Sequence, residues 1–453
     1  MRRVVKVSRI RIIITIIVVV LTTLLIGCTG KEPNEIAYVV ALGIDSTDDD
    51  NYKITIQYAN TTQISGGASE SGGKAGSEIV DNVTIEAPNI YAGVGLANNI
   101  VSKSFSMSHA KLIVFSKEIA EKGVKDMIET LVRSEEIRPD VFIAVANTTA
   151  NDYLTSVNPE MEVNPAQYYQ LIYQKNQLVG IPDGQLREFF TGLYTDNYDS
   201  ILPVAGVIDG SGGNSQNDDK GQSKDSQNEG SEGSSESLDS FESKSSNENE
   251  KEKDAEKNTS KYEYDIKNYV GGETTIEKKN KAEAIGAAVF EKDKMVGELG
   301  EVETEICKML KGDYTYSYLT YYNNDTPDIP ITVKTTQQKK PKYKIDTDKK
   351  TVDIELYIES DLYSLPADYN VENKIEDFER DVANYTSSAC TEFINNFTKK
   401  YNSDILKLNE KVKYKFLTNN QYNWFKKNVG WSEYKFSVCT NFKVRRTGLI
   451  VRE

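Results

Sequence analysis

Histidine is almost absent from this sequence, which has one histidine and four cysteines in 453 residues. The single histidine, His109, stands between Ser108 and Ala110 at the start of an expected strand, with no G-x-S-x-G motif and no cysteine beside it. A structural histidine is therefore favoured over a general base. We expect a protein that is not an enzyme and that needs no cofactor.

The cysteines are also too dispersed to define a site. Cys28, Cys307, Cys390 and Cys439 lie far apart, and no C-x-x-C pair occurs. This spacing fits neither a disulfide framework nor a zinc site. A disulfide between Cys390 and Cys439 stays open as the less favoured alternative, because lone cysteines mostly serve as small buried apolar residues.

Two partial motifs fail their patterns. The acidic run at residues 45–50 resembles a calcium loop, but Thr47 stands where Asp or Asn belongs and Asp50 replaces the required glycine. Hairpin turns collect aspartate for other reasons. Residues 72–74 resemble part of a phosphate-binding loop, but Ala75 replaces the Ser or Thr that must follow the lysine. We expect no metal site here.

Two further groups near the C-terminus have a functional and a structural interpretation. Lys443, Arg445 and Arg446 lie along an expected strand, where a solvated sheet face is favoured over a stripe for an anionic partner. Trp424 and Trp431 are expected to be buried anchors of the C-terminal region rather than ligand-stacking residues.

Basic residues are outnumbered, since 54 Lys and Arg face 69 Asp and Glu, for a formal charge of -15. This balance argues against a nucleic-acid surface. Basic residues nevertheless dominate the N-terminus, where five of them precede an apolar run at residues 12–26 and no acidic residue occurs before Glu32. The run is shorter than the roughly 20 residues that span a bilayer. Residues 1–27 therefore read as a signal peptide.

The end of that segment is more specific. Leu25, Ile26, Gly27 and Cys28 place an apolar residue, a small residue and a cysteine in the order of a bacterial lipobox. This similarity implies that a diacylglyceryl group is attached to the Cys28 thiol, that the chain is cut before Cys28 and that the new amino group is acylated. Several acyl chains hold a membrane firmly, at about 0.8 kcal/mol for each buried CH₂. Residues 28–33 would form the tether. The alternative is a plain membrane anchor in which Cys28 is incidental.

Hydrophobic patterning predicts a mixed α/β domain at residues 34–205. Strands at 38–44 and 53–58 would form a hairpin across an Asp-rich turn, and a Gly/Ser-rich loop follows at 65–77. Further elements are expected as a helix at 89–102, a strand at 111–115, a helix at 117–133 and a strand at 141–146. The strand, helix and strand sequence indicates a crossover unit within the sheet.

An acidic insertion separates this domain from the second region. Residues 206–261 are rich in Ser, Gly, Asn and Glu, and residues 210–260 hold 13 acidic and 6 basic residues. Such a segment buries too little surface to offset its ordering entropy, so disorder is predicted. Residues 262–453 are expected to be α+β with a largely antiparallel sheet. The expected elements are strands at 284–290, 352–358 and 436–444 and helices at 302–310 and 375–397.

Several separated blocks together resemble a known family. They lie at residues 34–45, 52–57, 108–115, 137–140, 286–297, 402–405 and 446–449, with the two tryptophans between the last two. Their order is similar to that of the Ger(x)C family, the lipoprotein C subunits of spore nutrient germinant receptors. The resemblance covers nearly all of the chain after Cys28, and the insertion is its main departure from the family pattern.

The resemblance implies a non-catalytic lipoprotein on the outer face of the inner spore membrane, acting with an A subunit and a B subunit in receptor assembly and signalling. It also implies three domains, so the second region can comprise two. No small-molecule ligand is assigned to this chain. The alternative is a solute-binding lipoprotein of a transporter, which should have two α/β lobes around a cleft. The insertion and the antiparallel C-terminal region count against it.

Cleavage before Cys28 would also change the charge. It removes five basic residues and no acidic one, which takes the formal charge from -15 to -20, with -7 of it in residues 210–260. Anionic lipid repels so acidic a protein. Acyl chains and partner subunits, rather than surface charge, are therefore expected to hold it at the membrane.

Overall fold

The structure is a computed structural model with all side chains. It describes residues 13–18, 35–49, 51–59, 80–159, 162, 164–174, 180–195, 197–208, 268–274, 280–322, 330–364, 374–401 and 403–446. Most of the expected signal peptide, the loop at 65–77 and the insertion from residue 209 onward lie outside the described residues. The assignments made for these segments stay predictions.

A mixed sheet dominates the described residues before the insertion, and nine described strands belong to it. Their order is β3-β2-β1-β5-β6-β7-β8-β9, and β4 pairs with β1. The strands are β1 (Ile36–Ser46), β2 (Tyr52–Ala59), β3 (Val80–Ala87), β4 (Ser104–Ser106), β5 (Leu112–Ser116), β6 (Phe142–Ala146), β7 (Ile201–Val207), β8 (Ala282–Glu291) and β9 (Lys294–Leu299).

The first predicted strands are confirmed. β1 and β2 form the expected hairpin, with Ile44 opposite Ile54. β5 and β6 are parallel neighbours, with Ile113 opposite Ile143, as the crossover unit requires. Both strands are buried along their whole length, which explains why their sequences are continuous apolar runs.

The sheet continues across the insertion. β7 includes residues 206 and 207, so the prediction that the disordered insertion starts at residue 206 is wrong. β8 follows the insertion, yet it pairs antiparallel with β7, with Ile201 opposite Val289. β9 then pairs with β8. The described residues on both sides of the insertion therefore belong to one compact unit.

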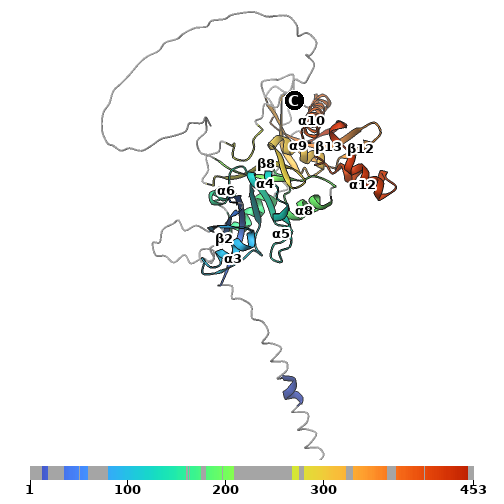
Figure 1. Cartoon of the computed structure of the whole chain (residues 1–453). Coiled ribbons are helices and arrows are strands. Elements are labelled where there is room, and N and C mark those ends of the chain that lie inside the picture. The colour runs from blue at the N-terminus through green and yellow to red at the C-terminus, as the bar shows by residue number, and fades with distance from the viewer. Residues whose placement is uncertain are drawn as a thin grey trace, which may run out of the picture. The chain divides into compact units, whose positions relative to one another are not determined.

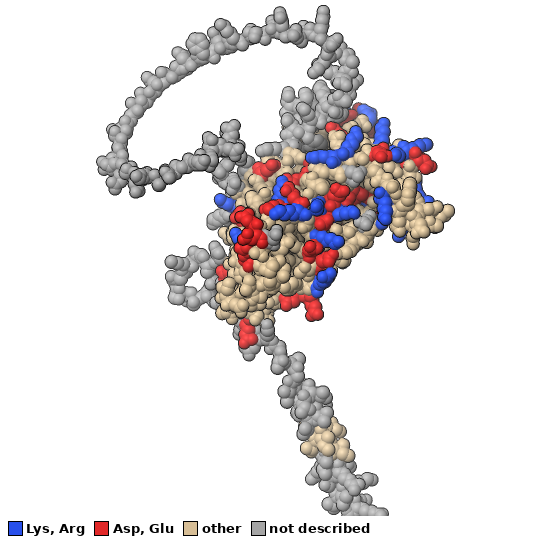
Figure 2. Space-filling model, viewed as in Figure 1, with Lys and Arg blue, Asp and Glu red and all other residues tan. Residues whose placement is uncertain are grey.

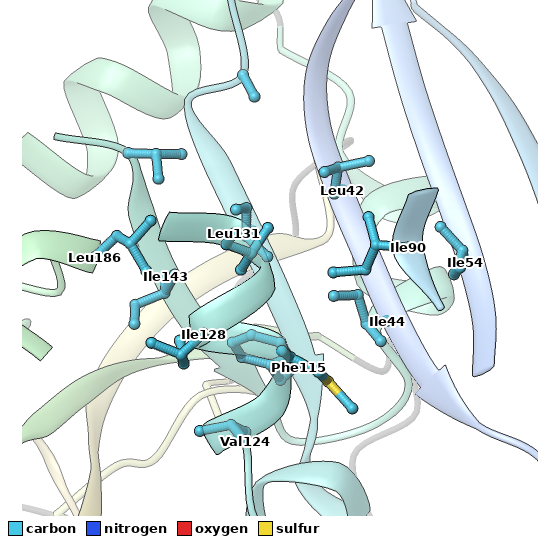
Figure 3. Close-up of a cluster of buried hydrophobic side chains, with 14 of the residues drawn as sticks. Leu42, Ile44, Ile54, Ile90, Phe115, Val124, Ile128, Leu131, Ile143 and Leu186 are labelled. Carbon is cyan, nitrogen blue, oxygen red and sulfur yellow. The ribbon is translucent and has the colours of Figure 1, made fainter. Parts of the chain in front are cut away.

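Helices cover both faces of this sheet (Figure 1). On one face lie α3 (Ile90–Ala97), α4 (Lys117–Lys122), α5 (Lys125–Val132) and α8 (Leu186–Thr195), and on the other lie α6 (Ala150–Ser156) and α7 (Pro165–Gln174). Figure 3 shows the first of these cores, in which Leu42 and Ile44 of β1 lie beside Ile90 of α3, and Phe115 of β5 lies beside Ile128 of α5. Burial of such side chains contributes about 1.5–3 kcal/mol each.

The helix predicted at 117–133 is wrong in one respect, because it is two helices. α4 ends at Gly123, whose φ of 124° lies in the region that favours glycine. A Cβ atom at Gly123 would lie 2.7 Å from Asp293 Oδ2, and the Val124 N–H donates to the Asp293 carbonyl at 3.0 Å. The β8–β9 turn, far away in the sequence, therefore fixes the break.

The helix predicted at 89–102 is also too long. Asn89 caps α3 by accepting from the Ala92 N–H at 2.9 Å, and the helix ends at Ala97. The next residue, Asn98, accepts from the Phe105 N–H at 2.8 Å. This bond directs the chain toward β4 instead of another helical turn.

A second sheet lies in the C-terminal region, in the order β10-β11-β13-β12 with β14 beside β13. Its strands are β10 (Tyr316–Tyr322), β11 (Pro330–Gln337), β12 (Lys342–Asp346), β13 (Thr351–Ser364) and β14 (Lys435–Arg446). All neighbours are antiparallel except β13 and β14, where Ile354 lies opposite Val438. The predicted α+β class with a largely antiparallel second sheet is confirmed.

Helices and short 3₁₀ segments complete this region. They are α9 (Glu301–Lys311), α10 (Ile375–Tyr401), α11 (Leu408–Val412), α12 (Asn419–Asn428), η3 (Lys413–Lys415) and η4 (Trp431–Glu433). α10 is the long predicted helix, and it buries Phe393 and Phe397 against Phe436 and Val438 of β14. This packing explains why the last strand alternates apolar and polar residues.

We predict that Gly206→Ala destabilises the fold by about 2–3 kcal/mol. A Cβ atom at Gly206 in β7 would lie 2.1 Å from the Gly272 backbone nitrogen, across the insertion, so backbone must shift. Urea unfolding followed by circular dichroism measures the change. Gly95→Ala is the matched control, because its Cβ meets nothing within 4 Å and the helix gains about 0.5–1 kcal/mol. Equal unfolding midpoints for the two variants would contradict the close approach.

Candidate functional site

The predicted lipidation site, Cys28, lies outside the described residues. Of the predicted signal peptide the structure describes residues 13–18, a helical segment with exposed apolar side chains. No helix in the described part of the chain is long and apolar enough to cross a membrane. The body begins at Glu35, seven residues after Cys28, and β1 starts at Ile36.

His109 has structural contacts. It lies in the turn before β5, where its Nδ1 is 3.0 Å from Ser108 Oγ. Its ring packs edge-on against Tyr38 at the start of β1, with the centroids 4.8 Å apart. These contacts join the turn to the first strand.

Asp45, the first residue of the acidic run, caps a helix. Its carboxylate oxygens accept from the Ala150 N–H at 2.6 Å and the Asn151 N–H at 3.0 Å, at the start of α6. Burial raises the pKa of Asp45, and the two backbone bonds oppose the shift. Among the described residues, no group of three or more His, Cys, Asp or Glu side chains is placed to hold a metal ion.

The three later cysteines are free thiols. Cys390 of α10 is buried in the C-terminal core, and burial raises the pKa of its thiol to about 12. Burial likewise raises the pKa of Cys307 to about 11. Cys439 is exposed on the other face of β14, where side chains alternate, so the open alternative of a Cys390–Cys439 disulfide does not occur in this structure.

The C-terminal basic stripe is largely matched by carboxylates. Lys443 pairs with Glu379 of α10, and Arg445 pairs with Glu359 of β13 at 3.2 Å. Arg446 is exposed. These contacts agree with the prediction that the three basic residues lie on a solvated face of the sheet.

The two tryptophans differ in burial. Trp431 is 2% exposed, and its Nε1 donates to Asn409 Oδ1 at 3.2 Å, as expected of a buried anchor. Trp424 is 68% exposed, so the prediction that it is buried is wrong. α12 has too few apolar residues for the sequence to show which face is buried. The contacts of Tyr422 turn the side of the helix that carries Tyr422 toward the core.

Trp424 belongs to an exposed surface that the sequence reasoning missed. Leu417 is 94% exposed and Tyr414 is 79% exposed, and an open groove of about 600 Å³ lies beside Leu417 and Trp424. Residues 411–432 contain five lysines and no acidic residue. We call Tyr414, Leu417 and Trp424, together with the exposed Lys413 and Lys427 of the same stretch, the aromatic–basic surface. The signal was in the sequence, as a locally basic stretch in an acidic chain.

Contacts from distant segments hold this surface in place. Tyr422 is buried under α12, and its hydroxyl donates to the Asn409 carbonyl at 3.1 Å and lies 3.3 Å from Asn197 Oδ1. Lys426 Nζ donates to the Thr195 carbonyl at 3.1 Å. In Figure 2 the uncharged atoms at the right-hand end lie where Figure 1 places α12. Exposed aromatic side chains on a fixed element are typical of a protein-binding surface.

A second set of contacts joins the residues before and after the insertion. The Asp404 N–H donates to Asp199 Oδ2 at 2.8 Å, and the Asp199 N–H donates to the Asp404 carbonyl at 3.1 Å. Lys407 Nζ binds Glu188 at 2.6 Å. Burial favours a raised pKa for Glu188, but the hydrogen bond from Lys407 and nearby lysines bring it below its usual value. The four residues form a polar junction.

A charged cleft of about 370 Å³ opens beside this junction, and Lys and Asp or Glu side chains both line it. Its charges are largely matched within the protein. Lys407 pairs with Glu188, Lys311 lies 4.0 Å from Asp313, and Lys308 Nζ donates to the Ile181 carbonyl at 3.0 Å. These three lysines of the cleft therefore have partners within the protein.

Comparison with known proteins identifies the family. Residues 30–207 match "Spore germination protein N-terminal domain", and residues 285–448 match "Spore germination B3/ GerAC like, C-terminal". The chain belongs to the Ger(x)C family of spore germination proteins. The two matches flank the insertion, so this Ger(x)C chain carries its extra residues between the two family domains.

Individual relatives are more distant. Spore germination protein KC of Bacillus subtilis (strain 168) is 28% identical over 160 residues, which cover 32% of this chain and 39% of that protein. Spore germination protein GerQC of Bacillus cereus is 24% identical over 196 residues, which cover 42% of this chain and 50% of that protein. The alignments thus span half or less of these relatives. A solved structure titled "Crystal Structure of the GerBC protein" is 14% identical, with a TM-score of 0.48, and the match covers 89% of this chain and 96% of that one.

Several blocks that resemble the Ger(x)C pattern have structural roles in this chain. The block at 34–45 ends in Asp45, which caps α6. The block at 402–405 supplies Asp404, whose carboxylate also accepts from the Leu408 and Asn409 N–H groups at 2.7 and 2.8 Å. Trp431 is a core anchor. In this chain Asp45 and Asp404 thus join neighbouring elements, and Trp431 anchors the core.

We predict that stability falls as pH rises from about 4.5 to 7, in part because of Asp404. Burial raises the pKa of Asp404 to about 7, against its two backbone bonds. Between about pH 4 and 7 the carboxyl group is protonated in the folded protein but ionised in the unfolded chain, whose pKa is near 4. The free energy of unfolding therefore decreases as pH rises through this range to about 7. Asp404→Asn should reduce the slope of unfolding free energy by up to about 1.4 kcal/mol per pH unit.

Urea unfolding at a series of pH values measures this slope. Glu305→Gln is the reference variant, because burial raises the pKa of Glu305 to about 7 as well. Each carboxyl group contributes its own part of the pH dependence. The Asp404→Asn protein should therefore lose the contribution of Asp404 and keep that of Glu305. An Asp404→Asn protein with the unchanged slope would refute the assignment.

Proposed function

We propose that this chain is the lipid-anchored subunit of a spore nutrient germinant receptor, required without catalysis for receptor assembly and signalling. The observation that carries the proposal is the lipobox at residues 25–28 in front of a body that belongs to the Ger(x)C family. The proposed location is the outer face of the inner spore membrane, with the A and B membrane subunits as partners.

The anchor raises the effective concentration of the protein near the membrane subunits and does not itself select them. Acyl chains on Cys28 confine the body to a thin layer above the bilayer, so that even a weak contact with a membrane subunit becomes effectively intramolecular. Residues 28–34 span at most about 25 Å when fully extended, which keeps the body close to its partners.

The aromatic–basic surface is the proposed contact with those partners. Tryptophan and tyrosine side chains carry much of the binding energy in protein interfaces, and Trp424 and Tyr414 are exposed on elements fixed from behind by Tyr422. Lys413 and Lys427 would form its polar rim and favour an acidic partner surface.

The alternative, a solute-binding lipoprotein, is less well supported. The described strands of the first sheet run continuously through β7 and β8 rather than forming two lobes around a cleft. In the charged cleft, Lys407 pairs with Glu188 and Lys311 pairs with Asp313. Calorimetry with amino acids, sugars and nucleosides separates the two functions, since tight direct binding would favour the alternative.

We predict that Cys28→Ala leaves a folded protein that is lost from the spore membrane fraction, with a poor nutrient response. The physical reason is the loss of every acyl chain that holds an acidic body at the bilayer. Fractionation of spores, metabolic labelling with a fatty acid and germination assays measure the effects. Cys439→Ala is the control, because Cys439 is an exposed free thiol outside the lipobox. Normal germination by the Cys28→Ala strain would rule out the role of the anchor.

We also predict that Trp424→Ala and Leu417→Asp each weaken co-purification of the A and B subunits, by about 30-fold in affinity for a hot-spot side chain. Both residues are exposed, so the fold should be unchanged in circular dichroism. Leu171→Asp is the matched control, since Leu171 is an exposed apolar residue of α7. If Trp424→Ala and Leu171→Asp retain the subunits equally, the aromatic–basic surface is not the interface.

A further inference from the structure

A second exposed apolar surface lies on α3. Residues 87–102 contain no charged residue, although 27% of the chain is charged. α3 buries Ile90, Val94 and Ala97 in the core. On its outer side Leu96 is 48% exposed, Tyr91 is 39% exposed, and Ile100 just beyond the helix is 69% exposed. A helix at a water-facing surface normally carries charged or polar residues there.

The fold places this surface where the chain enters the body. Asn98 accepts from the Phe105 N–H at 2.8 Å, which fixes the end of α3 to β4. β4 pairs with the first residues of β1, with Ser104 opposite Ile36. Figure 1 shows α3 and β2 at the lower end of the body, and Figure 2 shows mostly uncharged atoms there, with a few acidic side chains at the lower edge.

The length of the preceding chain limits how far this end can lie from the anchor. Cys28 and Ile36 are eight residues apart, so their separation cannot exceed about 29 Å. If Cys28 is lipidated, as the proposed function requires, the bilayer stays within that reach of the α3 surface.

We propose that the α3 surface, formed by Tyr91, Leu96 and Ile100, docks onto the lipid bilayer beside the anchor. Lipid is the occupant that the tether keeps in reach, whether or not a membrane subunit is bound. The absence of charge matters because the rest of the body is acidic and is repelled by anionic lipid. Apolar side chains at this end can enter the interfacial region without desolvating a charge. Docking would restrict the rotation of the body about its tether.

The test places an environment-sensitive fluorophore at position 100 of the full lipidated chain. Ile100→Cys in a Cys439→Ser background provides the labelling site, because Cys307 and Cys390 are buried. Leu417→Cys in the same background is the matched probe, since Leu417 is an exposed apolar residue on the aromatic–basic surface. Both proteins are reconstituted into phosphatidylcholine vesicles, with bromine-labelled acyl chains as quenchers, and flotation of the vesicles reports anchoring.

We expect the probe at position 100 to shift to the blue and to be quenched by the brominated lipid, while the probe at 417 shows the emission of a water-exposed dye. Replacing part of the phosphatidylcholine with phosphatidylglycerol should weaken the quenching at low salt, and added salt should restore it, because only the repelled acidic body senses lipid charge. Leu96→Asp should abolish the shift without preventing flotation.

Each other outcome overturns the inference. A floating protein whose probe at 100 remains water-exposed refutes docking but leaves the anchored function intact. A probe at 100 that becomes shielded only when the membrane subunits are present identifies a protein contact instead of lipid. A chain that does not float removes the anchor on which both proposals rest.

Discussion

The pairing of β7 with β8 is the contact on which the rest of the structure depends. It joins residues on the two sides of the insertion into one sheet, with Ile201 opposite Val289. Backbone hydrogen bonds of a central strand leave no freedom of register when both faces are buried. The polar junction of Asp199 and Asp404 then repeats the connection through side-chain and backbone bonds. The described residues on either side of the insertion are therefore held together by two separate sets of contacts.

The same constraint positions the functional surfaces. The turn between β8 and β9 ends α4 at Gly123, so a strand after the insertion determines the shape of a helix before it. α12 is held through Tyr422 and Lys426 by Asn197 and Thr195, which precede the insertion. The aromatic–basic surface thus exists only in the folded unit. The α3 surface depends instead on the local pairing of β4 with β1.

The two surfaces divide the proposed roles by chemistry. Uncharged apolar side chains near the tether suit lipid, because an acidic body gains nothing from anionic headgroups. Aromatic side chains among lysines, in a stretch of five lysines without an acid, suit a protein partner with acidic character. The net charge of -15 does not reveal either surface, because residues 411–432 hold five lysines and no acidic residue, while residues 87–102 hold no charged residue.

The sequence by itself determined the α+β class, the β1–β2 hairpin, the crossover unit and the long α10, because period-2 and period-3.6 patterns of burial are local. The lipobox at Cys28 is a prediction from an equally local pattern, and it rests on the sequence alone. Only the tertiary structure decided that β7 and β8 pair, that Gly123 interrupts a helix and that Trp424 faces outward while Trp431 is buried. Each of these features depends on a contact with a residue far away in the chain. That contact outweighs the conformation that the local sequence favours.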